Sequence, residues 1–461
     1  MSTDVDARPT PRAPRFGVLL LLLALLAFAM REAYVLSAIV DGPIRGDIRE
    51  YVAAAWNLVA HGTFSTTLPP GVPVPDSFRL PGYPWLIALG MTLFPQDPDW
   101  VRLGGWYPFV LQAQVVLGTL SVVLVALLAR HWLRPTWAIF AGLVLALWPH
   151  HIAATNTLLS EVLFGFMLVA ALYCFARAWT TGRIGWYALA GATFGYAWLV
   201  NPVVLLFPPC LAALTWWHGS RRPAAVMLAL FLVPVLGMTI RNAGLDTEAR
   251  GSAGRASINF VQGSWPNYHP AANAVSKGDP VAIAIIQEID AENAALVADP
   301  MAGLKRMRAR MAEDPAWYAE WYASKPWVLW GWKIRLGASD IHYHVVRNSL
   351  LERNAVLRSI VAIYRWCTPA LTTITLAAGL VLMLIGLRRR SWVPAAAVGA
   401  LAIYLTLVHV VLQAEPRYAT AYRGLEAVLV ATALAWLVAK ARDAKLIRRM
   451  SAIRVTRRVT L

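Results

Sequence analysis

"FGVLLLLLALLAFAM", residues 16–30, is an uncharged apolar stretch, and the apolar character resumes after Arg31 and Glu32 in "AYVLSAIV", residues 33–40. A helix of about 20 apolar residues is long enough to cross the hydrocarbon layer of a bilayer. A basic segment precedes the stretch, as in a signal peptide, but no small-residue cleavage site is evident. We therefore expect an uncleaved first span whose N-terminus faces the cytoplasm.

This stretch is the first of about ten apolar segments, which predict an all-α polytopic membrane protein with about 10 transmembrane helices. The segments cover roughly 17–40, 106–130, 136–152, 157–178, 185–200, 202–217, 224–240, 366–387, 392–412 and 419–439. Prolines interrupt "WLVNPVVLLFPP", residues 198–209. Such breaks are tolerated where the freed backbone groups face protein or a water-filled cavity.

The composition excludes most other classes of protein. Hydrophobic residues make up 58% of the 461 residues and charged residues 15%, whereas soluble domains contain about 25% charged residues. The net charge of +17 is explained by arginines next to spans and by contact with anionic membrane lipids. No basic stripe lies on a soluble module, so nucleic acid is not an expected partner. The three cysteines are odd in number, which argues against a disulfide framework.

Basic residues in the short turns indicate an orientation. With the N-terminus in the cytoplasm, every short basic turn falls on the cytoplasmic side, in agreement with the positive-inside rule. These residues are Arg130, Arg134, Arg177, Arg183, Arg221, Arg222, Arg388, Arg389 and Arg390. We therefore expect a multi-pass protein of the bacterial inner membrane with both termini in the cytoplasm.

Two long loops then face outward. The expected division is a cytoplasmic N-terminus at 1–16, a transmembrane module at 17–240 with a first outer loop at 41–105, a periplasmic lobe at 241–365, transmembrane helices at 366–439 and a basic cytoplasmic tail at 440–461. The lobe is expected to be mostly helical, and Asp314–Pro315 is a typical N-cap and N1 pair. The tryptophans that follow predict a helix along the bilayer surface. They are Trp317, Trp321, Trp327, Trp330 and Trp332.

The first outer loop contains "GDIREYVAAAWNLVAHG", residues 46–62, whose apolar residues repeat at helical spacing. An amphipathic helix in the membrane interface is expected. Asp47 is either the N-cap of this helix or lies in its first turn, with Glu50 and Tyr51 on the same face. If it only caps the helix, its role is structural. Downstream, "RLPGYP", residues 79–84, bends the chain back toward the membrane before another short apolar helix.

The order of these motifs resembles glycosyltransferase family 39 and its aminoarabinose-transferase relatives, polytopic membrane enzymes that use polyprenyl-phosphate sugars. The resemblance begins with Gly-Asp-x-x-x-Tyr at 46–51 and Arg-x-Pro-Gly-Tyr-Pro at 79–84. It continues through "TNTLLSEVLFGFML" (155–168), "NPVVLLFPP" (201–209), "TIRNAGL" (239–245), "ASINFVQGSWPNYH" (256–269) and "QAEPRYATAYRG" (413–424). One departure is Ile48, which stands where many members have a second acid directly after the aspartate.

The resemblance implies an inverting transfer, in which an acceptor hydroxyl attacks the anomeric carbon of a lipid-phosphate sugar. Such a step needs a carboxylate as general base and cations on the leaving phosphate. We assign the base to Asp47, which lies in the family motif close behind a span, and a second catalytic acid to Glu161. Glu161 has an alternative role as a charge favoured at a helix N-terminus.

Arginine suits the phosphate because its guanidinium binds two oxygens. Arg417 in "EPRY" and Arg241 after the seventh apolar segment are the first choices. Each has an alternative role: Arg241 could extend to the membrane interface, and Arg417 could pair with Glu415. Further candidates for substrate binding lie in the same motifs. They are Tyr51, Arg79, Tyr83, Glu50 and Tyr418.

Histidines give only weak evidence for a metal. His150 and His151 are adjacent, which is poor chelating spacing on a helix, and His342 and His344 have no nearby acid. No cofactor is expected, and a divalent metal is left open.

The expected partners are a polyprenyl-phosphate sugar donor, an envelope acceptor (lipid, glycan or protein) and membrane lipids. A lipid-linked-sugar flippase or secondary transporter is the main alternative, since broken helices suit it. Charged residues collect at the outer rim and no inverted repeat is evident, which favours the enzyme. A non-catalytic assembly protein is a second alternative; it is supported by Ile48 and opposed by Asp47, Glu161 and Arg417 occurring together.

Overall fold

The computed structural model describes residues 16–94, 102–245 and 251–459, without the side chains of 251–254 and 444–459. Its regular elements are helices, joined by loops, and one antiparallel pair of short strands, β1 (Ile39–Val40) and β2 (Val346–Arg347). The prediction of an all-helical membrane protein is confirmed. Nearly all of the predicted cytoplasmic segment at 1–16, and most side chains of the basic tail, lie outside the described residues.

The helices of the first half surround a continuous apolar core. They are α1 (Phe16–Ser37), α2 (Asp47–His61), α3 (Gly82–Leu93), α4 (Trp106–Ala129), α5 (Pro135–Ala146), α6 (Pro149–Ala153), η1 (Ala154–Asn156), α7 (Glu161–Thr181), α8 (Ile184–Val200), η2 (Pro202–Val204), α9 (Phe207–Trp217) and α10 (Arg221–Ala243). Five helices form the lobe: α11 (Gly251–Gly263), α12 (Tyr268–Val275), α13 (Pro280–Ala298), α14 (Pro300–Glu313) and α15 (Pro315–Leu329). The chain ends with α16 (Leu350–Arg353), α17 (Ala355–Arg388), η3 (Arg390–Trp392), α18 (Val393–Val411), α19 (Pro416–Ala419), η4 (Thr420–Tyr422) and α20 (Arg423–Val459).

In the described part of the chain, seven helices are long and apolar enough to cross a membrane. An eighth span results if α5 and the helix after it, which meet at a 57° bend, count as one. All ten predicted segments are helical, but α8 has only 17 residues and Pro202–Trp217 is also short. Seven or eight of the ten predicted segments therefore have the length of a membrane span, and the segments 185–200 and 202–217 form shorter helices.

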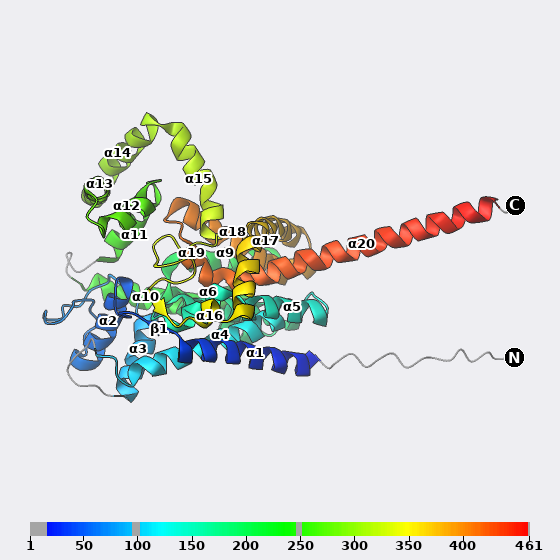
Figure 1. Ribbon diagram of the computed structural model, residues 1–461, viewed down its shortest axis with the longest axis horizontal. Coiled ribbons are helices and arrows are strands. Elements are labelled where there is room, and N and C mark those ends of the chain that lie inside the picture. Colours follow the sequence, from blue (N-terminus) through cyan, green and yellow to red (C-terminus); the bar gives the residue numbers. More distant parts are fainter. Residues whose placement is uncertain (1–15, 95–101, 246–250, 460–461) are drawn as a thin grey trace.

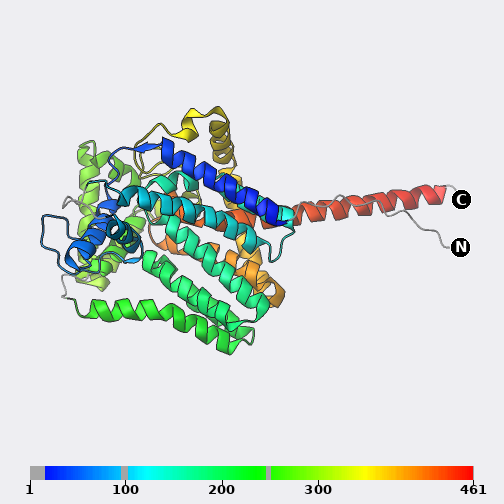
Figure 2. The same ribbon diagram turned by 90° about the horizontal axis from the view of Figure 1, so that it is seen from below.

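The two ends of the bundle differ (Figures 1 and 2). The first residues of α1 and the far end of α20 lie at one end, whereas α2, α3 and the lobe lie at the other, called here the lobe end. The predicted basic turns gather at the end opposite the lobe. Arg390 donates a hydrogen bond to the carbonyl of His218 at 3.1 Å and lies 5.4 Å from the ring centre of Trp179.

The lobe is attached to the bundle by buried polar contacts. Lys325 on α15 donates hydrogen bonds to the carbonyls of Gly263, the last residue of α11, at 2.8 Å and of Leu412, directly after α18, at 2.6 Å. His269 on α12 lies 3.2 Å from a carboxylate oxygen of Glu415, which directly precedes α19. These contacts fix the lobe beside the segment that carries Arg417.

Three of the five tryptophans expected along the bilayer surface are buried inside the protein. Trp321 is 7%, Trp330 0% and Trp332 9% exposed. The indole N–H of Trp321 donates to the carbonyl of Gly263, and that of Trp330 donates to the hydroxyl of Thr406. The prediction was wrong for these three, because aromatic residues suit a buried interface between helices as well as a bilayer surface. The predicted N-cap at Asp314 is confirmed by its hydrogen bond from the N–H of Trp317.

Arg31 of α1 donates hydrogen bonds to backbone carbonyls at the bend between α5 and α6. Its guanidinium donates to Leu145 O at 3.3 Å and to Ala146 O at 3.4 Å, and it contacts His151 Nδ1 at 2.8 Å. The Arg31 side chain is fully buried. Backbone groups in a membrane span need partners within the protein, so we expect this residue to stabilise the bend.

Replacing Arg31 by leucine is expected to destabilise the protein by about 2–4 kcal/mol, since each buried polar group left without a partner costs about 1–3 kcal/mol. The measurement is the unfolding temperature of the purified protein in detergent. Arg49→Leu, which removes an exposed arginine from α2, is the control. An Arg31→Leu protein that unfolds at the temperature of the control would contradict this account of the bend.

Candidate active site

Asp47 is positioned by the glycine before it. Gly46 is the N-cap of α2, with φ of 54°, a conformation that residues with a Cβ rarely adopt. A Cβ added to Gly46 would also lie 2.9 Å from the hydroxyl of Tyr343. Asp47 is the first residue of the helix, so the interpretation of Asp47 as the N-cap is wrong and the first-turn alternative is right.

Replacing Gly46 by alanine is expected to destabilise the protein by about 1–3 kcal/mol, the cost of a strained backbone conformation, and more than Gly62→Ala does. Gly62 is a matched control, because it has φ of 65° but nothing within 4 Å of an added Cβ. Thermal unfolding of both variants measures the difference. Adding Tyr343→Phe should recover part of the loss at Gly46. If both glycine variants unfold alike, the contact with Tyr343 does not constrain this turn.

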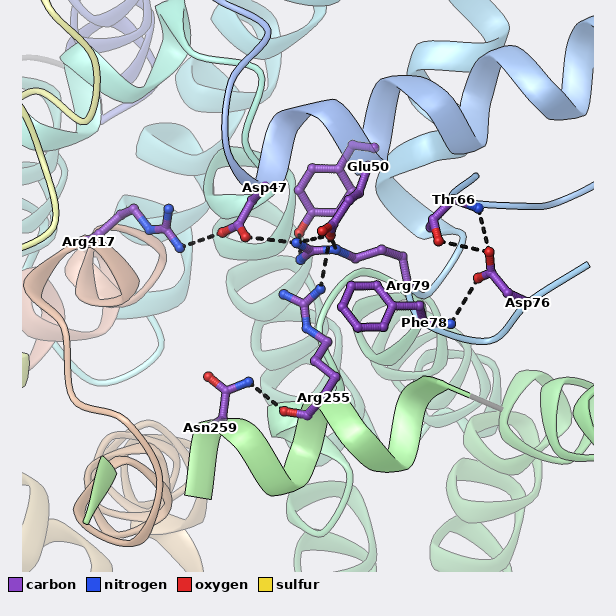
Figure 3. A network of polar contacts seen from close by, with 10 residues as sticks. Asp47, Glu50, Thr66, Asp76, Phe78, Arg79, Arg255, Asn259 and Arg417 are labelled. Carbon is purple, nitrogen blue, oxygen red and sulfur yellow. Dashed lines mark hydrogen bonds and ion pairs between the residues drawn. The ribbon is translucent and has the colours of Figure 1, made fainter. Parts of the chain in front are cut away.

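The carboxylate of Asp47 lies between two guanidinium groups (Figure 3). Its Oδ1 accepts a hydrogen bond from Arg79 Nη2 at 2.8 Å, and its Oδ2 accepts one from Arg417 Nη2 at 2.9 Å. Arg79 lies in the loop before α3 and Arg417 on α19. The Asp47 side chain is 32% exposed, whereas those of Arg79 and Arg417 are 4% and 13% exposed. A ligand can therefore reach the carboxylate, while the protein holds both arginines from behind.

The same face of α2 supplies further partners for Arg79. Arg79 Nε donates to a carboxylate oxygen of Glu50, and Nη1 donates to the Tyr51 hydroxyl at 3.3 Å. The predicted common face of Asp47, Glu50 and Tyr51 is thus confirmed. Arg255 on α11 approaches Glu50 from the lobe at 3.9 Å, and Figure 3 shows that it points toward the cluster.

Glu161, the first residue of α7, lies on the other side of Arg417. Its Oε1 is 3.3 Å from Arg417 Nε, and its side chain is 11% exposed. A close approach makes this contact possible, because a Cβ on Gly165 of α7 would lie 2.8 Å from the backbone oxygen of Ala421 in η4. Arg417 therefore joins Asp47 and Glu161.

The interpretation of Arg417 as a partner of Glu415 is wrong. Glu415 accepts a hydrogen bond from the backbone N–H of Arg335 at 2.7 Å and contacts His269. Arg417 instead lies over the ring of Tyr343, 4.4 Å from its centre. Alternate residues of "EPRY" thus point in different directions, which the sequence alone did not indicate.

Neighbouring charges determine the protonation state of Asp47. Burial by itself raises the pKa of Asp47, but the charges of Arg417, Arg79 and Arg255 outweigh it and hold this pKa well below its ordinary value. Asp47 is therefore ionised at neutral pH and serves as a counter-ion in this arrangement. A carboxylate with such a low pKa is a poor base, and it becomes more basic when another anion takes over one of its arginines.

Of the remaining predicted residues, Tyr83 and Tyr418 contact members of this cluster, whereas Arg241 has other partners. Arg241 donates to the carbonyls of Asp76 and of Phe64, so it holds the first loop, and in the described part of the chain no contact joins it to Asp47. Tyr83 is buried, donates to Gln114 at 3.1 Å and packs its ring against Tyr51. Tyr418 lies beside Arg417, with 5.3 Å between the guanidinium carbon and the ring centre.

Sequence reasoning missed Arg255 and Tyr343. Arg255 directly precedes "ASINFVQGSWPNYH", and Tyr343 lies in "HYH", which drew attention only as a weak metal motif. A search for cations next to family motifs would have found Arg255, whereas nothing local distinguishes Tyr343. Within the described residues, no group of three or more His, Cys, Asp or Glu side chains is arranged to hold a metal ion.

One segment of the chain matches a known protein family. Residues 74–241, which include Arg79 and Glu161, match the family described as dolichyl-phosphate-mannose-protein mannosyltransferase. This segment of the chain is similar to that family of membrane glycosyltransferases. The match confirms the resemblance drawn from the sequence motifs. None of the proteins with curated functions matches the chain.

Solved structures with a similar fold include the archaeal oligosaccharyltransferase AglB from Archaeoglobus fulgidus. The form tethered to an acceptor peptide with an NVT sequon has a TM-score of 0.53 and 16% identity, over 92% of this chain and 50% of that one. The form with an inhibitory peptide and a dolichol-phosphate has a TM-score of 0.50 and 16% identity, over 94% and 52%. ArnT from Cupriavidus metallidurans bound to undecaprenyl phosphate has a TM-score of 0.38 and 16% identity, over 86% and 77%. The chain thus spans about half the length of the oligosaccharyltransferase, with which it shares a fold.

Proposed function

We propose that the protein transfers a sugar from a polyprenyl-phosphate donor to a hydroxyl of an envelope acceptor, with inversion at the anomeric carbon. The observation that carries the proposal is the accessible Asp47 carboxylate bound between Arg79 and Arg417. A carboxylate can accept the proton of an attacking hydroxyl, and arginine can bind two phosphate oxygens. The description of the matching family names a dolichyl-phosphate sugar, which supports this class of donor.

In the proposed reaction, the donor phosphate binds Arg417 and Arg79 and displaces Asp47 from at least one of them. The acceptor oxygen then forms a bond to the anomeric carbon, while the bond from that carbon to the phosphate oxygen breaks. The electron pair leaves with the lipid phosphate, where the guanidinium charges stabilise it. The proton of the acceptor hydroxyl passes to Asp47. Donor binding thus produces the base that the reaction requires.

Glu161 is proposed to orient this machinery from the side opposite Asp47. Its contact with Arg417 Nε fixes the plane of the guanidinium, so that Nη2 faces Asp47 and an incoming phosphate. Glu50 and Tyr51 do the same for Arg79. No cofactor is part of the proposal.

The site is proposed to face the periplasm of a bacterial inner membrane. The basic turns and the far end of α20 lie at the end opposite the lobe, and cytoplasmic turns are enriched in Arg and Lys. This orientation puts Asp47 on the outer side, where a sugar on a flipped lipid carrier is available.

The test uses proteoliposomes with the purified protein, a panel of radiolabelled polyprenyl-phosphate sugars and an envelope extract as acceptor, with and without a metal chelator. Transfer of label to the extract, or slow release of free sugar, supports the proposal. Movement of intact labelled lipid across the bilayer without cleavage of the donor would overturn it in favour of a flippase. Arg49→Gln on α2, with an exposed side chain, serves as the control variant.

A further inference from the structure

A groove with a volume of about 710 Å³ lies between the lobe and the last part of the chain. Its walls come from the end of α12, from the segment that follows α15, and from α16 and α17. The buried side chains of Trp332, Ile334 and Ile341 supply apolar surface to it. Pockets that bind small ligands usually measure about 300–1,000 Å³, so the groove has the size of a ligand site.

The groove carries an excess of positive charge. Four cations and two acids line it: Lys277, Lys333, Arg335, Arg365, Asp340 and Glu352. Arg365 and Asp340 form one ion pair, with 3.3 Å between Nη1 and Oδ2. Within the described residues, no ion pair involves the other three cations. Three positive charges therefore face one groove without a paired carboxylate.

Arg335 is the least exposed of these three cations. Lys277 and Lys333 are exposed, whereas Arg335 is half-buried. Burial lowers the pKa of Arg335, and the charge of Glu415 opposes this shift without cancelling it. A charge that is removed from water is costly unless an opposite charge compensates it. An anion bound in the groove would supply this compensation.

The neutral part of the lining suits a sugar chain. Asn273, Ser276 and Ser339 place an amide and two hydroxyls along the groove, and such groups both donate and accept hydrogen bonds. By contrast, Ile363 and Trp366, two exposed apolar side chains of α17 that would suit lipid chains, do not line it. The groove thus combines cations with hydrogen-bonding groups, and this composition fits an acidic glycan better than a phospholipid.

The groove lies next to the candidate active site. Ile334 and Ile341 line the groove and also line a small cavity beside it. Other residues that line this cavity are Glu161, Arg417, His150 and His342. The backbone N–H of Arg335 donates to a carboxylate oxygen of Glu415, two residues before Arg417, at 2.7 Å. The segment that forms one wall of the groove therefore also contacts the segment that carries Arg417.

We propose that this groove binds acidic sugar units of the acceptor, away from the hydroxyl that reacts at Asp47. The proposal rests on the proposed transferase function and gives its acceptor a chemical class. Contacts with parts of a substrate that do not react contribute binding energy, and complementary charges select among partners. The unpaired cations are therefore expected to favour acidic over neutral acceptors.

The first experiment measures the binding of a galacturonic acid hexasaccharide, and of its neutral methyl ester, to the purified protein in detergent. Wild type should bind the acid about tenfold more tightly than the ester, since one hydrogen bond to a charged group has about this effect. The preference should be lost in the groove variant, which combines Lys333→Gln with Arg335→Gln. The control combines Arg353→Gln with Arg358→Gln, two exposed arginines outside the groove lining, and should keep the preference.

The second experiment adds these probes to the proteoliposome assay with the envelope extract. An excess of the acidic hexasaccharide should slow the transfer of label to the extract, but not the release of free sugar, which needs no acceptor. The ester should slow neither. In the groove variant, half-maximal transfer should require about tenfold more extract, with little change in the maximal rate. A general structural defect would instead lower the maximal rate.

Three results would overturn the acidic-acceptor groove. One is equal binding of the acid and the ester by wild type, and another is the same loss of preference in the control as in the groove variant. The third is a bound hexasaccharide that does not slow transfer. A wild-type protein that neither transfers nor releases sugar would instead refute the proposed function, whereas the binding measurement does not depend on the reaction. The two failures are therefore distinguishable.

Discussion

Asp47→Asn is expected to abolish transfer and, at the same time, to bind the lipid-phosphate donor more tightly than wild type. Loss of a general base costs about 10²–10⁴-fold in rate. The gain in affinity follows from the resting structure, in which Asp47 occupies Arg79 and Arg417. Asparagine leaves both guanidinium groups free for phosphate, and a tenfold gain corresponds to about 1.4 kcal/mol.

Two measurements on the purified protein check this result: the dissociation constant for a polyprenyl phosphate and the rate of sugar transfer. The control is Glu320→Gln, which also removes one negative charge, but from an exposed position on α15. Weaker or unchanged donor binding by Asp47→Asn would mean that the phosphate does not compete with Asp47 for the arginines. Near-normal transfer would mean that another group is the base.

Arg417→Lys is expected to lower the rate of transfer by about 10²–10³-fold, the usual effect of removing one donor to a developing negative charge. Lysine retains the charge but has a single ammonium group. Its three N–H donors share one nitrogen, so it cannot contact Asp47 and Glu161 from two separate nitrogens, as Nη2 and Nε of Arg417 do. Both the donor affinity and the transfer rate should therefore fall.

Arg255→Lys is the matched control, because Arg255 also approaches the cluster but, within the described residues, its ion pair is with Glu50 alone, at 3.9 Å. Its transfer rate should stay within about threefold of wild type, as for a weak, partly exposed ion pair. Equal losses in the two variants would show that charge alone matters and that the fork geometry of Arg417 does not. Steady-state kinetics over a range of donor concentrations separate the effects on affinity and rate.

Local sequence patterns predicted the parts of the site that lie within one element. The spacing of Asp47, Glu50 and Tyr51 gave their common helical face, and contacts of all three with Arg79 confirm it. The motif "RLPGYP" predicted the return of the chain before α3, a helix over Gly82–Leu93. Such predictions succeed because helical periodicity and proline chemistry act over a few residues.

Contacts between distant segments were not predictable in the same way. The partners of Arg417, the position of Arg241 on the loop carbonyls and the approach of Tyr343 to Gly46 depend on how α19, α10 and the segment after the lobe pack. None of these contacts has a local pattern that predicts it. The cavity lined by His150 and His342 is a further case, since 192 positions separate its two histidines.

Hydropathy and short motifs predicted a helical membrane protein, its apolar segments, and the acids and arginines of the family motifs. They did so because both are properties of the chain before it folds. The packing of distant segments determines that Asp47 and Glu161 share one arginine and that Arg255 approaches Glu50 from the lobe. The physical reason is that close packing fixes the distances between charges on different helices, and these distances determine which carboxylate is paired, which is accessible and which arginine can bind a phosphate.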